Sequence, residues 1–400
     1  MRVSFWQKVR YVLLLLLVIL IALSSHPSVT SASIAMGIVN GTFLSPYILV
    51  VFAALFVFSI RAVFKFRLQK RLWLLFVVIL FTHLCIYFLF QTPKMMEDIR
   101  SIGICLCAIC IGCQFDFRES GFRFVLFVFA GLMTVIGLIQ VMTGIGGFEI
   151  LDQSATSTNK NSFGVALATS ILFYLTAAMD KNNKQVFRII SFSLLVLTFV
   201  ILLTIRARAA TLSSLLIVVY YVFITYKNNY KKSFLWRIIG IAILVALLVL
   251  FLPDSVGNYI YDSFFQNHED DITSGRTERN LSAIHFLKDN LIAGNLDGFA
   301  HVPWIHNYPL LKLYDYGLFF SFPVLFLYFY LLVFAIKKSL KEKVTVWNFG
   351  VFALIIPFIA SMAEPTLPFG PGTATVFNFI MFGVFLKYLH GLKDEDSPNL

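Results

Sequence analysis

The chain has 400 residues, of which 59% are hydrophobic and only 13% are charged, and its formal net charge is +11. Soluble globular domains carry about 25% charged residues, so this composition argues against a soluble globular protein. The positive charge does not indicate nucleic-acid binding, because the basic residues follow the alternating pattern of a membrane protein. We therefore expect a single membrane domain spanning residues 1–400.

Apolar segments recur along the whole chain. Runs of about 17–20 apolar residues are long enough to cross the hydrocarbon core of a bilayer as helices. The sequence predicts an all-α integral membrane protein of about twelve transmembrane helices. The segments lie at 11–24, 44–60, 73–90, 99–114, 123–141, 162–179, 189–204, 209–226, 237–252, 314–335, 346–362 and 373–388.

The basic residues predict how these helices are oriented. If the N-terminus is cytoplasmic and the segments alternate, 23 of the 32 Lys and Arg residues fall on the inner side, which leaves 9 outside. This is the positive-inside asymmetry, and it predicts that both termini are cytoplasmic. The first segment follows basic residues and precedes small ones, as in a signal peptide. The alternating count favours an uncleaved first helix.

Four of the five cysteines lie in the segment at 99–114. Cys107, Cys110 and Cys113 have a spacing similar to that of iron–sulfur ligands. The segment is apolar and offers no flanking polar ligands, so we expect these thiols, with Cys105, to pack between helices. No metal site and no cofactor are expected.

One sizeable hydrophilic segment, 253–312, lies on the outer side in this topology. It holds eight acids and four of the seven histidines. Long loops in compact proteins are usually functional or disordered, and a solvated spacer is the alternative here. Ser274 can cap a helix that runs to about Asn290. Its expected apolar face suits the membrane surface or the helix bundle, and consists of Leu281, Ile284, Leu287 and Leu291.

Two arginines, Arg206 and Arg208, interrupt the apolar run 189–226 at the outer face. Cations at membrane depth are costly and usually face a cavity, a partner or the interface. A tight turn whose arginines reach the lipid headgroups would explain them. The alternative is an anion site, because the planar guanidinium matches phosphate oxygens and stays charged at any relevant pH.

Two further polar features lie at the same face. Asn159 is a suitable N-cap for the helix beginning near 162, whose start would offer free backbone N–H groups. His306 and Asn307 precede the helix beginning near 314. A neutral histidine there could take a proton from an attacking hydroxyl, although a plain hydrogen-bonding role would also explain it.

Together these residues resemble the O-antigen ligase and polymerase superfamily of membrane glycosyltransferases. The stretch TNKNSFG at 158–164 resembles the family's Asn-x-Asn helix start, and TIRARAATL at 204–212 resembles its Ser-Arg-Gly-Ala turn. SGR at 274–276 resembles the second arginine motif. His306-Asn307, followed after nine residues by Gly317, resembles the ligase signature. The motifs cover about 150–335, all at the predicted outer face.

The chain departs from the family pattern at several positions. Lys160 stands where the usual middle residue is proline, and Ala207 and Ala209 replace the common Ser and Gly. Gly294 alone remains of a Gly-x-Gly found in many relatives, and Phe320 replaces a small or polar residue. These departures leave the fine specificity open.

The resemblance implies a GT-C-like fold with one large extracytoplasmic loop containing short helices. It implies transfer of a glycan from a polyprenyl diphosphate donor to a hydroxyl acceptor, with inversion and without a metal. Arginines must then stabilise the diphosphate leaving group. Arg208 and Arg276 are expected in this role and His306 as the general base. The expected substrate-binding residues are Arg206, Arg279, Asn159, Asn161 and Asn307.

The resemblance also implies a location in the bacterial cytoplasmic membrane. The first expectation is a polymerase of capsule, exopolysaccharide or O-antigen repeat units carried on undecaprenyl diphosphate. Its partners would be the lipid-linked donor and acceptor and the membrane lipids, with a flippase and chain-length regulators as candidates and no nucleic acid. The alternatives are an O-antigen ligase and a lipid-linked oligosaccharide flippase. A flippase would usually carry polar residues near the mid-membrane.

Overall fold

The computed structural model describes most of the chain as helices. The residues it describes are 5–38, 42–90, 94–117, 119–142, 157–180, 182–205, 207–229, 276–296, 305–341, 349–370 and 373–395. These ranges contain helices and turns and no strand. The all-α prediction is therefore confirmed for them. The predicted segment at 237–252 and most of the hydrophilic loop, up to residue 275, lie outside the described residues.

Every other predicted apolar segment coincides with a helix. Among the described residues, two helices are additional to these segments, α2 after the first segment and α13 in the hydrophilic loop. The helices are α1 (Phe5–Ser24), α2 (Pro27–Ala35), α3 (Ser45–Lys65), α4 (Arg67–Phe90), α5 (Lys94–Gly112), α6 (Ser120–Met142), α8 (Ser157–Met179), α9 (Gln185–Thr204), α10 (Arg208–Asn229), α13 (Arg276–Asn290), α14 (Tyr308–Lys341), α15 (Phe349–Ala360) and α16 (Thr373–Glu395).

Six of the described helices are long and apolar enough to cross a membrane: α1, α3, α4, α6, α9 and α14. Shorter apolar stretches lie in α8, α10, α15 and α16. A helix satisfies its own backbone hydrogen bonds, which a chain in lipid requires. The helices therefore indicate a multi-pass membrane protein.

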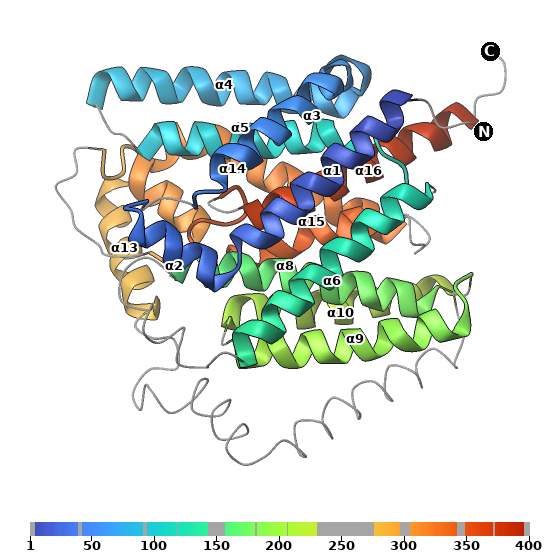
Figure 1. Ribbon diagram of the computed structural model, residues 1–400. Coiled ribbons are helices and arrows are strands. Elements are labelled where there is room, and N and C mark those ends of the chain that lie inside the picture. The colour runs from blue at the N-terminus through green and yellow to red at the C-terminus, as the bar shows by residue number, and fades with distance from the viewer. Residues whose placement is uncertain are drawn as a thin grey trace.

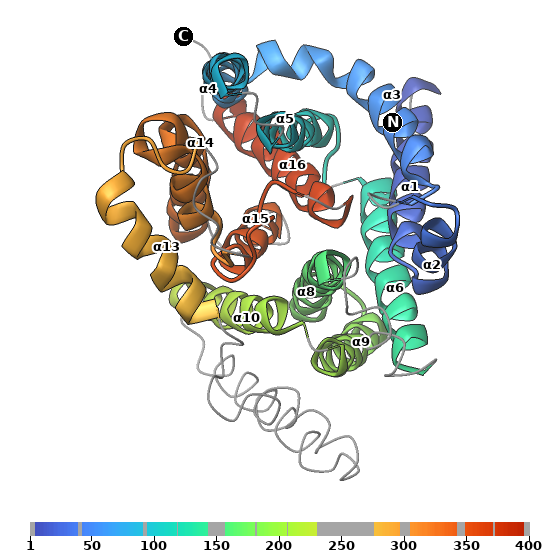
Figure 2. The same cartoon turned by 90° about the vertical axis from the view of Figure 1, so that its left-hand side faces the viewer.

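The apolar helices run side by side, and α13 lies across one end of them (Figure 1). The start of α1 lies toward the opposite end of the molecule (Figure 1). In the end-on view, α5, α8, α15 and α16 lie inside a ring formed by other helices (Figure 2). Accordingly, almost every residue of α15 is buried, as are the aromatic residues of α16 from Phe377 to Phe385.

Two glycines allow α5 and α16 to cross closely. A Cβ atom on Gly112 would meet the carbonyl oxygen of Ile380 at 2.0 Å, and one on Gly383 would meet that of Ile109 at 2.1 Å. Small residues allow such close approach between membrane helices. Cys105, Cys110 and Cys113 are buried along the same helix, and all five cysteines are free. The expectation that the thiols pack between helices is confirmed for these three, whereas Cys107 is only partly buried.

The helix predicted within the hydrophilic loop exists, but only part of its expected apolar face is buried in the bundle. α13 ends at Asn290, as predicted, and packs on α14. Ala283 is buried in a cluster with Tyr314 of α14, and Leu287 is also buried. The other members of the predicted face are exposed, at 49% for Leu281, 44% for Ile284 and 46% for Leu291. On the side of α13 that meets α14, the ring of Phe286 packs on that of Tyr314, with 5.1 Å between the ring centres.

Candidate active site at the end of the bundle

Arg276, the first residue of α13, binds the segment that follows α15. Its Nη1 donates a hydrogen bond to the carbonyl oxygen of Ala363 at 2.9 Å. Its Nη2 lies 3.3 Å from Oε1 of Glu364, and this carboxylate is almost completely buried. The two contacts use two of the five N–H donors of an arginine. The guanidinium is thus held at the end of the bundle while remaining partly exposed.

One helical turn further along α13, Arg279 approaches His306. The distance from Arg279 Nη1 to His306 Nε2 is 3.4 Å, which makes a long and weak hydrogen bond. Because a guanidinium only donates, Nε2 must be the acceptor, and the imidazole proton then lies on Nδ1. This Nδ1 is buried and has no hydrogen-bond partner among the residues that the structure describes.

His306 is kept neutral by its surroundings. Burial, together with the positive charges of Arg276 and Arg279, lowers the pKa of His306 to about 4 from its ordinary value of 6.5. Both causes disfavour the imidazolium, since a buried charge is poorly solvated and nearby cations repel it. At neutral pH the side chain is therefore an uncharged imidazole that can accept a proton.

Asn307 fixes the backbone next to His306. Its Oδ1 accepts a hydrogen bond from the N–H of Leu310 at 3.0 Å, which caps α14. Its Nδ2 donates to the carbonyl oxygen of Met362 at 3.2 Å, and the N–H of Tyr308 donates to the carbonyl oxygen of Ser361 at 3.0 Å. The start of α14 is thereby joined to the same segment that holds Arg276.

Two glycines join the end of α13 to α14. Gly294 and Gly317 have positive φ angles of +63° and +66°, and a Cβ atom on Gly294 would lie 2.2 Å from the backbone nitrogen of Gly317. The N–H of Asn295 donates to the carbonyl oxygen of Tyr314 at 2.7 Å, and that of Leu318 donates to Leu291 at 2.7 Å. Only glycine fits both positions, so these two residues fix α13, and with it Arg276 and Arg279, on α14.

Of the other two predicted arginines, the structure describes only Arg208. Arg208 is the first residue of α10, and its side chain is half-buried. In Figure 2, α13 runs from the α14 side of the bundle toward the α10 side. Arg206 lies outside the described residues. The participation of these two arginines in the site stays a prediction.

The expected capping role of Asn159 was wrong. α8 begins at Ser157, so Asn159 and Asn161 lie within the first turns of the helix rather than before it. Serine and threonine cap helices about as well as asparagine, and residues 154–158 offer several of them. Both asparagines nevertheless lie in the first turns of α8, and their substrate-binding role stays a prediction.

Glu364 was missed by the sequence analysis. It lies between two apolar segments, 346–362 and 373–388, and its partner Arg276 is 88 residues away in the chain. The available signal was that an acid stood alone between two membrane segments, where a charge needs a partner.

Residues 192–295 match the family model described as O-antigen ligase. The resemblance to the O-antigen ligase and polymerase superfamily is confirmed. No curated protein matches the chain.

The part of the chain that matches the O-antigen ligase family runs from α9 to the end of α13. It includes Arg208, Arg276 and Arg279 and ends before His306. The match supports a membrane function of the O-antigen ligase or polymerase type, which is the transfer of a glycan from a lipid-linked oligosaccharide.

Proposed function

We propose that this protein polymerises polyprenyl-diphosphate-linked oligosaccharide repeat units at the outer face of the bacterial cytoplasmic membrane. The product would be a capsular polysaccharide, an exopolysaccharide or an O-antigen. The observation that supports this proposal best is the convergence of Arg276, Arg279 and a neutral His306 at one end of a membrane bundle. Two cations beside a proton acceptor suit a reaction in which a diphosphate leaves and a hydroxyl attacks.

In the proposed reaction the acceptor hydroxyl oxygen attacks the anomeric carbon of the donor sugar. The new glycosidic bond forms as the bond to the diphosphate oxygen breaks, which inverts the configuration at that carbon. The hydroxyl proton passes to His306, and the polyprenyl diphosphate leaves with the bonding electrons. Arg276 and Arg208 stabilise the charge that builds on the diphosphate, so the step requires no metal.

The remaining predicted residues would bind the substrates. Arg206 and Arg279 suit the phosphates, and Asn159, Asn161 and Asn307 suit sugar hydroxyls or phosphate oxygens. Movement of the Arg279 guanidinium from His306 to the diphosphate would free Nε2 to accept the hydroxyl proton. The weak contact of 3.4 Å supports such an exchange, because little interaction energy is lost.

The proposal includes the topology predicted from the basic residues. Both termini would be cytoplasmic, and the loop at 253–312 would be extracytoplasmic within a single membrane domain. All the segments that build the site lie at one end of the bundle: the start of α13, residues 305–307 and residues 361–364. A site that binds a lipid carrier from one leaflet requires its residues to lie at one end of the bundle.

An O-antigen ligase is the second candidate, and the description of the matching family model favours it. A strain that lacks the gene separates the candidates. Accumulation of single lipid-linked repeat units is the expected result and indicates a polymerase. Long lipid-linked chains left unattached would indicate a ligase, and repeat units trapped in the inner leaflet would contradict both candidates and indicate a flippase.

The pH dependence of the reaction is a further prediction. In the free protein the pKa of His306 is about 4. We therefore expect kcat/KM to stay constant as the pH falls from about 8 to about 5, and to decrease only as His306 becomes protonated near its pKa. A bound diphosphate would offset the charges of Arg276 and Arg279 and raise this pKa. The acid decrease in kcat should then occur at a higher pH than that in kcat/KM, and coincident decreases would argue against the proposed geometry.

A further inference from the structure

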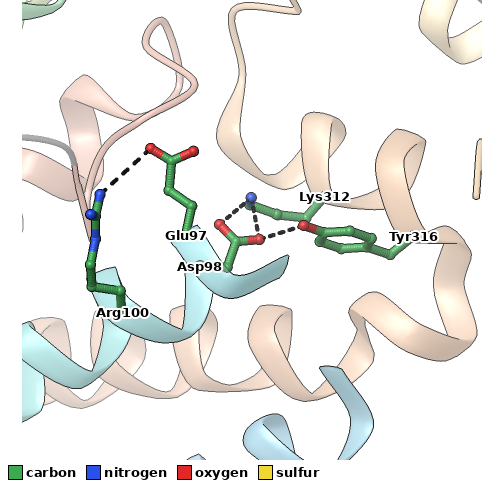
Figure 3. A network of polar contacts seen from close by, with 5 residues as sticks. All are labelled: Glu97, Asp98, Arg100, Lys312 and Tyr316. Atoms are coloured by element: carbon green, nitrogen blue, oxygen red, sulfur yellow. Dashed lines mark hydrogen bonds and ion pairs between the residues drawn. The ribbon is translucent and has the colours of Figure 1, made fainter. Parts of the chain in front are cut away.

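A buried ion pair joins α5 to α14 close to the candidate site. Nζ of Lys312 lies 2.6 and 2.7 Å from the two carboxylate oxygens of Asp98, and the Tyr316 hydroxyl donates to the same carboxylate at 2.7 Å (Figure 3). One carboxylate therefore receives hydrogen bonds from two side chains of successive turns of α14. The contact joins residues that lie 214 positions apart in the chain.

Aromatic rings enclose the lysine of this pair. Nζ lies 5.2 Å from the ring centre of Tyr308 and 5.4 Å from that of Tyr316, within the range of cation–π contacts. Lys312 is only 6% exposed. An ion pair in such an enclosure is weakly screened by water, and it has a preferred geometry because its hydrogen bonds are directional.

The pair acts on the turn of α14 that begins beside His306. Lys312 lies one helical turn after Tyr308, the first residue of α14. The start of this helix is already held on one side by Asn307 and by the contact of Tyr308 with Ser361. From α5, Asp98 holds Lys312, which ends this turn on the same face of α14 as Tyr308. The first turn of α14 is thereby fixed by two elements that are distant in the sequence.

We propose that Asp98, acting through Lys312, is a positioning residue that sets the place of His306 for the transfer reaction. This inference rests on the proposed function, because it assigns Asp98 to the same site. Two apolar side chains would hold α5 and α14 together equally well, and buried ion pairs are often no better for stability than apolar packing. A pair with three short, directional hydrogen bonds instead specifies one position of α14 along α5.

Position matters here because the base must reach a hydroxyl proton within hydrogen-bond distance. A displacement of about 1 Å from the productive geometry can reduce a rate by roughly 10²-fold. Releasing the first turns of α14 from Asp98 would let His306 shift relative to the two arginines. The glycine junction that holds α13 lies further along α14, at the non-helical Gly317, and Arg276 is held separately by Glu364. Binding of the lipid carrier by the arginines would be unaffected.

The test uses the double variant D98N/K312M in the full-length protein, since it leaves no unpaired buried charge. We expect normal membrane insertion and melting temperature, an unchanged KM for a lipid-linked repeat unit and a kcat lowered at least about tenfold. Amide hydrogen exchange should increase in peptides covering residues 305–312 and remain unchanged elsewhere. K312R, which keeps a cation able to donate to Asp98, should retain more of kcat than K312M.

Glu97 and Arg100 provide a matched control on the same turns of α5. Their side chains are 4.0 Å apart and largely exposed (Figure 3). The variant E97Q/R100Q removes a charge pair that does not reach α14, and it should leave both kcat and hydrogen exchange unchanged. A D98N/K312M protein that folds and retains the kcat of this control would overturn the proposal, as would a loss of folded protein in proportion to the loss of activity.

The outcomes also separate this inference from the proposed function. If D98N/K312M is as active as the control while H306A is inactive, only the positioning role of Asp98 is lost. If H306A is also fully active, the proposed chemistry itself is wrong. The exchange measurement does not depend on activity, so it reports the position of α14 in either case.

Discussion

Replacement of Arg276 by alanine is expected to lower the rate of glycan transfer by about 10²–10³-fold, the usual effect of losing one charge contact to a developing anion. The structure fixes this guanidinium at the end of the bundle through Ala363 and Glu364 while leaving it partly exposed. The rate should be measured with a lipid-linked repeat unit on purified protein. Arg276 would also contact the diphosphate of the bound donor before the reaction. KM for the donor should therefore rise as well.

Loss of Arg276 also leaves the carboxylate of Glu364 unpaired, and breaking a buried ion pair can itself be costly. Arg276 is partly exposed, so solvent screening reduces this cost. The double variant R276A/E364Q removes the unpaired charge and serves as the control for folding. It should be as stable as the wild type and as inactive as R276A. Recovery of activity in the double variant would show that Arg276 only neutralises Glu364.

Replacement of His306 by alanine is the second change with a large expected effect. General base catalysis contributes about 10²–10⁴-fold, so kcat should fall by a factor in this range while donor binding persists. The reason lies in the environment of the imidazole, which two arginines and burial keep uncharged. The measurement is the single-turnover rate with donor and acceptor both bound.

His285 offers a matched control for this variant. It is an exposed histidine on α13, the helix that carries both arginines. H285A should transfer glycan at the wild-type rate. If H306A were equally active, the histidine would have no part in proton transfer, and the long contact with Arg279 would be merely structural.

Hydropathy predicted the helices of this protein well because few backbone conformations satisfy their own hydrogen bonds in lipid. A segment of about 20 apolar residues must form a helix to satisfy its own N–H and C=O groups in the bilayer. The loop helix α13 was also predictable, because a cap-type residue precedes it and its apolar residues have helical spacing. Both signals are local in sequence.

The packing of α13 was not predictable in the same way. The spacing of large apolar residues gave a face for the membrane surface or the bundle without deciding between them, and it did not indicate that Ala283 is buried in the cluster with Tyr314. Small residues give a weak hydropathy signal, yet they permit the closest contacts. The Gly294–Gly317 contact follows the same rule: both glycines were noted in the sequence, but not that they meet.

The polar partners at the end of the bundle depend entirely on tertiary structure. The arginine and histidine of the site were identified from their motifs, and the structure brings Arg279 within 3.4 Å of His306. Glu364 and Asp98 belong to other segments, and no local pattern relates them to Arg276 and Lys312. Their importance becomes visible only where α5, α13, α14 and the segment after α15 meet.

The central claim is that these arginines and His306 transfer a glycan from a lipid diphosphate without a metal. The most direct measurement uses the purified wild-type protein in lipid vesicles, supplied with a polyprenyl-diphosphate-linked repeat unit and an excess of EDTA. We predict a ladder of lengthened lipid-linked chains and release of free polyprenyl diphosphate. Absence of chain growth with EDTA, restored by a divalent cation, would contradict the account.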